Sequence, residues 1–188
     1  MTVHSGKYLL DKLRTFNPKK LLNKNKQVLA VMSSEHEIIV NEIIKLLRGG
    51  STHIGLKDAL DGLPAHARGD KSVKLPYSIW QLVEHIRISQ WDMLQFCLDA
   101  NHKSPKWPDE YWPKEAAPAD DKAWEDALKQ IDDDLEQFIR LFQEEDIYKE
   151  IPHGNGQSLL REALQIADHT SYHISEIIVI RRLQDNYR

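Results

Sequence analysis

Apolar residues recur at every third or fourth position along most of the sequence, and no segment alternates convincingly with a period of two. The first pattern places apolar side chains on one face of an α-helix, whereas the second is typical of a half-buried strand. The sequence therefore predicts an all-α fold. We expect a short helix near Gly55–Leu63 and four long helices: Ser33–Leu47, Ser78–Ala100, one within Asp120–Glu144, and one from Ser158 to about Gln184.

The connection between the second and third long helices, Asn101–Ala119, is long and polar and contains four prolines and three aromatic residues. Proline ends helices, and the aromatic side chains indicate that the segment packs against the protein. A connection of this length allows the two helices to run parallel, whereas a short loop would make them antiparallel. Four helices with such linkers predict a helical bundle.

Residues 1–32 carry seven basic side chains and one acidic side chain, Asp11. This segment is either a basic arm that binds nucleic acid or membrane, or an additional helix that docks through its apolar residues. A single basic segment with few aromatic residues is a weak nucleic-acid signature. We therefore expect a basic N-terminal extension, residues 1–32, docked on a bundle formed by residues 33–188.

The composition excludes several classes of protein. The chain has 188 residues, a net charge of −4 and 41% hydrophobic residues, which is typical of a globular protein and not of a disordered one. Its apolar runs are far shorter than the ~20 residues that span a bilayer, and no secretory signal opens the chain. We expect no membrane or nucleic-acid partner. The single cysteine, Cys97, fits a reducing, cytoplasmic compartment, and its place on an apolar stripe favours an inert core thiol.

Nine histidines are the unusual feature of the composition. His169 and His173 are four residues apart, so they share one helix face, which also carries Ile166 and Ile177. Two adjacent buried imidazoles are a poor core choice without a cation, because each must place a polar nitrogen. His85, on the flank of the second helix's apolar stripe, provides a third imidazole. We expect solvated loop positions for His4, His66, His102 and His153, and a hydrogen-bonded core position for His36.

Three neutral imidazoles leave room for water on a metal ion, which is typical of a catalytic site and not of a structural one. Imidazole suits zinc, nickel, copper or iron, so we expect a divalent ion, zinc or nickel. Two other metal-site patterns fail. The Glu-x-x-His pattern of di-metal bundles occurs only at Glu150–His153, across Pro152, and the zincin pattern beginning at His36 has Val40 where histidine is required.

Two stretches of the chain, SIWQLVEHI from Ser78 and DHTSYHI from Asp168, the second leading to an arginine pair after Ile180, resemble the DinB/YfiT-like superfamily. The resemblance covers roughly residues 33–186. It implies a four-helix bundle with up-down-down-up topology, often dimeric. In that family a histidine of helix two and an HxxxH pair of helix four bind a divalent metal, which implies the metal ligands His85, His169 and His173. The N-terminal extension departs from the family's usual compact form.

The resemblance leaves the reaction open, since some members resemble thiol-dependent S-transferases and others are assigned as metal-dependent hydrolases. One hypothesis is an enzyme that acts on a small molecule, with a low-molecular-weight thiol as a candidate partner. The alternative is a non-catalytic metal-binding or interaction bundle. The sequence identifies no catalytic base or nucleophile. His53 is a candidate fourth ligand, proton shuttle or surface residue. Glu162 and Glu176 are candidate acceptors for the ligand imidazoles, whereas Tyr172 and Glu84 project elsewhere.

Overall fold

The structure, a computed structural model, describes residues 35–49, 52–71 and 75–187. The chain divides into two units, residues 1–41 and 42–188. Of the first unit, only residues 35–41 are described, and they are helical. The expected docked extension at residues 1–32 lies outside the described residues and stays a prediction.

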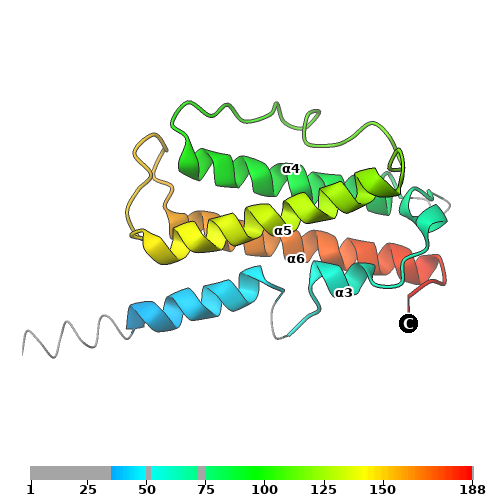
Figure 1. The fold of residues 1–188 in the computed structure, drawn as a ribbon, viewed down its shortest axis with the longest axis horizontal. Coiled ribbons are helices and arrows are strands. Elements are labelled where there is room, and N and C mark those ends of the chain that lie inside the picture. The colour runs from blue at the N-terminus through cyan, green and yellow to red at the C-terminus, as the bar shows by residue number, and fades with distance from the viewer. Residues whose placement is uncertain (1–34, 50–51, 72–74, 188) are drawn as a thin grey trace, which may run out of the picture. The chain divides into compact units, whose positions relative to one another are not determined.

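The regular elements described in the second unit are all helices (Figure 1). The helix that includes residues 35–41 continues to residue 47. The remaining elements, in chain order, are α3 (Leu56–Leu60), the 3₁₀ helix η1 (Ala65–Arg68), α4 (Ile79–Leu98), α5 (Asp121–Glu144) and α6 (Leu159–Leu183). The described ranges contain no strand, only an isolated bridge between Glu150 and Ser158. The prediction of an all-α fold is confirmed.

Each of the three long helices α4, α5 and α6 begins after a polar N-cap residue whose side chain accepts a backbone hydrogen bond. The backbone N–H groups of Ala123 and Arg161 donate to the side chains of Asp120 and Ser158, respectively. At Ser78 the pairing is reciprocal, because its Oγ accepts from the N–H of Gln81 and the Gln81 side chain accepts from the N–H of Ser78. Such capping boxes fix where a helix starts. The start of α4 in turn sets the position of His85 along the bundle.

Hydrogen bonds between the long helices establish their directions. Arg87 and Gln90 of α4 bond to Gln130 and Ile131 of α5, while Ser78, at the start of α4, bonds to the segment that precedes α5. The two helices therefore run parallel, as the long connection between them predicts (Figure 1). By contrast, the end of α4 lies near the start of α6, since His153 bonds to Phe96, so α6 runs antiparallel to α4.

The core of the second unit lies where α4, α5 and α6 meet. Its central residues are large and almost fully buried: Ile79, Leu82, Val83, Ile86, Trp124, Ile131, Ile177 and Ile180. Arg181, the first of the arginine pair, is also buried, and its guanidinium donates to the carbonyl groups of Ala59 and Asn186. This pairing connects the end of α6 to α3. No helix within the described residues is long and apolar enough to cross a membrane.

Candidate metal centre

Three histidines meet between α4 and α6. One ligand nitrogen from each of His85, His169 and His173 lies within 4.8 Å of the other two. The Nε2 atoms of His85 and His169 are 3.0 Å apart. A tetrahedral zinc ion with Zn–N bonds of about 2.0–2.1 Å holds its ligand nitrogens roughly 3.3 Å apart, so His85 and His169 already lie close to the spacing that one ion requires. Within the described part of the chain, no other group of three His, Cys, Asp or Glu residues meets the same criterion.

The proton of His85 has a defined place. Nδ1 of this ring lies 2.9 Å from the backbone carbonyl oxygen of Tyr111, in the connection between α4 and α5. A carbonyl oxygen only accepts, so Nδ1 carries the proton and Nε2 of the neutral ring presents its lone pair. The lone pair is on the nitrogen that lies next to His169, which is the tautomer that binds a metal through Nε2.

The carboxylate of Glu176 accepts the Nδ1 proton of His173, as the Tyr111 carbonyl does for His85. Nδ1 of His173 lies 2.7 Å from one oxygen of Glu176, and the other oxygen of Glu176 accepts from the hydroxyl of Tyr77. Burial and the bond to Glu176 raise the pKa of Tyr77 to about 12, so the hydroxyl remains a donor. A carboxylate hydrogen-bonded to a histidine fixes the orientation of the ring and increases its basicity as a ligand.

The surroundings favour neutral imidazoles. Burial, together with the neighbouring His173 and His85, lowers the pKa of His169 to about 3. Burial also lowers the pKa of His85. Because a metal binds the unprotonated nitrogen, a ring that resists protonation keeps its lone pair available. The donor set, three imidazole nitrogens from rings of which two have their Nδ1 held by an acceptor, therefore fits a divalent metal ion.

A comparison with known protein families extends this result. A model of the DinB superfamily matches residues 55–177, about two thirds of the chain, and the match includes all three histidines. The chain belongs to the DinB superfamily. No curated protein and no solved structure matches it.

In this DinB chain, aromatic residues of the connection between α4 and α5 surround His85. The indole of Trp112 stacks on the imidazole, with ring centroids 3.9 Å apart and an interplanar angle of 7°. Trp107 is 70% exposed, and its ring centroid is 6.2 Å from that of His85. The sequence indicates that these aromatic residues pack against the protein, but not that they pack on His85. The signal that could have suggested it is their density in WPDEYW, residues 107–112, within the connection that runs back along α4.

The two glutamates that the sequence offers as acceptors have different positions. Glu176 bonds to His173, as described above. Glu162 is buried on the same side of α6, but no hydrogen bond in the described part of the chain joins it to the three histidines. Burial raises the pKa of Glu162. Of the residues expected to project elsewhere, Glu84 pairs with Arg87, while Tyr172 is exposed and its ring edge contacts His173.

The remaining histidines of the DinB chain lie apart from the cluster. His53 bonds to Ser171, on a different side of α6, and is not one of the three grouped residues. His66 is exposed, as predicted, and His153 is exposed and bonds to Phe96. The prediction of a solvated loop position is wrong for His102, because its ring is largely buried and lies 2.7 Å from Asp92. His36 is half-buried and His4 lies outside the described residues.

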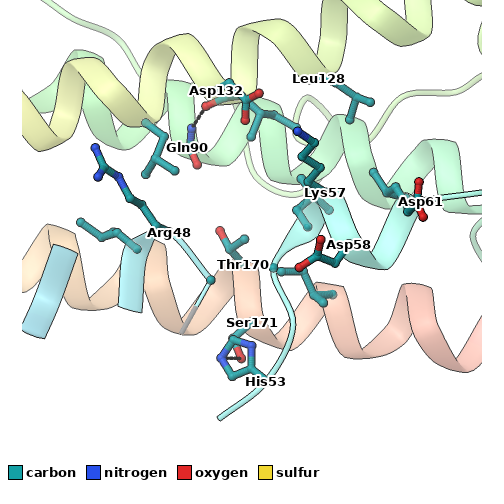
Figure 2. A pocket seen from close by; sticks show the side chains of 18 of the residues that line it. Arg48, His53, Lys57, Asp58, Asp61, Gln90, Leu128, Asp132, Thr170 and Ser171 are labelled. Carbon is teal, nitrogen blue, oxygen red and sulfur yellow. Dashed lines mark hydrogen bonds between the residues drawn. The ribbon is translucent and has the colours of Figure 1, made fainter. Parts of the chain in front are cut away.

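Two hollows lie near the site. A cavity of about 600 Å³ opens between α3, α5 and α6, and Figure 2 shows His53, Gln90, Thr170 and Ser171 around it. None of the three clustered histidines lines this cavity. A smaller hollow of about 340 Å³ does reach His169, and the residues beside it are Met93, Gln165, Asp168 and Tyr172. Of the three clustered histidines, His169 is therefore the one that lines this hollow.

Proposed function

We propose that this DinB protein is a metal-dependent enzyme acting on a small molecule, with His85, His169 and His173 as the metal ligands. The observation that carries the proposal is the convergence of the three imidazoles, two of which have their Nδ1 protons fixed by acceptors. The hollow at His169 supports the enzymatic interpretation, because a ligand set of three leaves room for a substrate and the hollow provides access to it.

In such an enzyme, the metal ligands, their hydrogen-bond acceptors and the surrounding aromatic residues would each have a separate role. A divalent ion held by three neutral imidazoles supplies a Lewis acid, which polarises a carbonyl group, lowers the pKa of water or binds a thiol as thiolate. In the neutral rings, the Tyr111 carbonyl and the Glu176 carboxylate would hold the proton on Nδ1 of His85 and His173 and leave Nε2 available to the metal. Trp112 covers one face of His85 and excludes water from it. Met93 and Tyr172 provide apolar walls for a bound molecule beside His169.

The reaction classes that suit such a site are hydrolysis and thiol-dependent S-transfer, the second with a low-molecular-weight thiol as co-substrate. Imidazole ligands do not select between zinc and nickel. We favour zinc in the cell because of its availability, and expect nickel in material purified by nickel-affinity chromatography. The competing function is a non-catalytic metal-binding or interaction protein, which a closed coordination shell would support.

We further propose an up-down-down-up four-helix bundle in which the helix at residues 35–47 is the first and α4, α5 and α6 are the others. The parallel pair α4 and α5 and the antiparallel α6 support this arrangement. We also propose a cytoplasmic homodimer whose partners are small molecules and not membranes or nucleic acids. Its mild net charge of −4 supports the last point.

The decisive experiment begins with elemental analysis of untagged protein purified without added metal. We expect close to one zinc ion per chain. The protein is then screened for thiol transfer and for hydrolysis, with zinc removed and restored, and His169→Ala serves as the inactive control. Zinc-dependent turnover that His169→Ala lacks is the expected result. A metal-free protein that also fails to bind added zinc or nickel would overturn the proposal.

A further inference from the structure

A chain of hydrogen bonds runs from His85 through the α4–α5 connection and back to α4. The carbonyl oxygen of Tyr111 accepts from Nδ1 of His85, and the hydroxyl of Tyr111 donates to Oδ2 of Asp92 at 2.5 Å. Oδ1 of Asp92 accepts from Nε2 of His102 at 2.7 Å. Asp92 follows His85 by seven residues, which places both on one face of α4 two turns apart. The connection is thus bonded to α4 at His85 and again at Asp92.

Both oxygens of Asp92 have donors from the same connection. Asp92 is only 9% exposed, and a buried carboxylate without partners is costly, so the two donors and the carboxylate hold one another in place. Burial and the bond to Asp92 raise the pKa of Tyr111, so its hydroxyl stays protonated and donates. His102 is also largely enclosed, with its ring edge against Trp91.

The acceptor for His85 needs such support because it lies in irregular backbone. Residues 111–120 form bends and no helix, so no ladder of backbone hydrogen bonds fixes the Tyr111 carbonyl. Two side-chain contacts hold the Tyr111–Trp112 peptide instead. The hydroxyl of Tyr111 donates to Asp92, and the indole of Trp112 stacks on His85.

We propose that Asp92, Tyr111 and His102 are positioning residues for the metal ligand His85. Through them, the α4–α5 connection holds the carbonyl that keeps the proton of His85 on Nδ1 and leaves Nε2 free to bind metal. This inference rests on the proposed metal site. It assigns a role to the Tyr111 hydroxyl, to Asp92 and to His102, a histidine outside the proposed ligand set.

The first test measures the zinc dissociation constant of the full-length protein by competition with a chromophoric chelator. Loss of an outer hydrogen-bond partner typically weakens metal binding by about 10–100-fold. We expect Asp92→Asn to fall in that range and Tyr111→Phe and His102→Ala at its lower end. Because the Tyr111 hydroxyl and Asp92 act on His85 through the one bond that they share, the double variant Asp92→Asn/Tyr111→Phe should bind zinc about as weakly as Asp92→Asn alone. Asp109→Asn, an exposed carboxylate of the same connection, is the matched control and should bind like the wild type.

The second test uses metal-free protein and separates positioning from a purely structural role. Nitrogen-15 NMR of the histidine rings at neutral pH should show His85 in the wild type as the Nδ1–H tautomer. In Tyr111→Phe, which removes a single hydroxyl and is expected to fold, a fraction of His85 should change to the Nε2–H tautomer. Unchanged tautomer and zinc affinity in Tyr111→Phe and Asp92→Asn would overturn this inference. If the wild type itself bound no zinc, the proposed function would fail, and the tautomer measurement would still decide the role of the network.

Discussion

The imidazole of His85 lies flat against the indole of Trp112, 3.9 Å from centroid to centroid. The contact joins a proposed metal ligand to a fluorophore, so metal binding should be visible in tryptophan emission. Adding nickel or copper to the metal-free protein should quench part of the fluorescence at one equivalent of metal. Trp112→Phe should lose most of that change, whereas the core variant Trp124→Phe should retain it. Equal quenching in both variants would place the bound ion elsewhere.

Glu176→Gln should weaken zinc binding about 10–100-fold without unfolding the protein. The variant keeps the shape of the side chain but replaces the carboxylate that accepts from His173 and Tyr77. Tyr77→Phe removes only the outer bond and should have a smaller effect. Zinc competition titrations measure both. A Glu176→Gln protein with wild-type affinity would show that the carboxylate does not support the ligand.

His169→Ala should abolish stoichiometric metal binding while leaving the helical circular dichroism spectrum largely intact. A core built from the apolar faces of α4, α5 and α6 does not need an ion to fold in a chain of this length. Elemental analysis and far-ultraviolet spectra provide the two measurements, and His66→Ala, an exposed histidine, is the control. Loss of the fold together with the metal would identify the site as structural.

The metal-free protein should become less stable as the pH falls from about 6.5 towards 3. The pKa of His169 is lowered to about 3 in the folded state, whereas the unfolded chain binds the proton near pH 6.5. Between these values the unfolded state takes up more protons, so acid favours unfolding by up to about 1.4 kcal/mol per pH unit. Urea unfolding at pH 7.5 and 5 should show a smaller difference for His169→Gln than for the wild type. Equal pH dependence would contradict the lowered pKa.

Cys97 should react slowly in the native protein. Burial, and then the neighbouring Glu162, raise the pKa of its thiol to about 12. The thiolate is the reactive form, so alkylation at pH 8 should be about a thousandfold slower than in the urea-unfolded chain. Mass spectrometry after timed exposure to iodoacetamide measures the ratio. Fast alkylation of Cys97 in the native protein would contradict the raised pKa and would favour a catalytic role for this thiol.

The helices could be predicted from the sequence because their signals are local. Ser78, Asp120 and Ser158 are cap residues directly before apolar repeats, and the structure starts the helices there. Local register placed His85, His169 and His173 on inward faces of their helices, and the family resemblance implied that the three meet, as they do in the structure.

The surroundings of the three histidines could not be predicted in the same way. His102 looked like a solvated loop residue because its partner, Asp92, is identifiable only after the connection has folded back on α4. The acceptor for His85 is a backbone carbonyl, and every residue has one, so no residue type could point to Tyr111. The helical register allowed either Glu162 or Glu176 to accept a hydrogen bond from a histidine of α6, and only the packed structure shows that Glu176 does so.

The parallel arrangement of α4 and α5 also bears on when the site forms during folding. His85 and His169 are 84 residues apart in sequence, and between them the chain must close the long α4–α5 connection and then reverse into α6. Contacts of such separation have a large loop-closure entropy and form late compared with helices. In refolding experiments, helical circular dichroism should therefore return before the protein can capture an ion. The time course of metal binding would then report when α6 packs against α4.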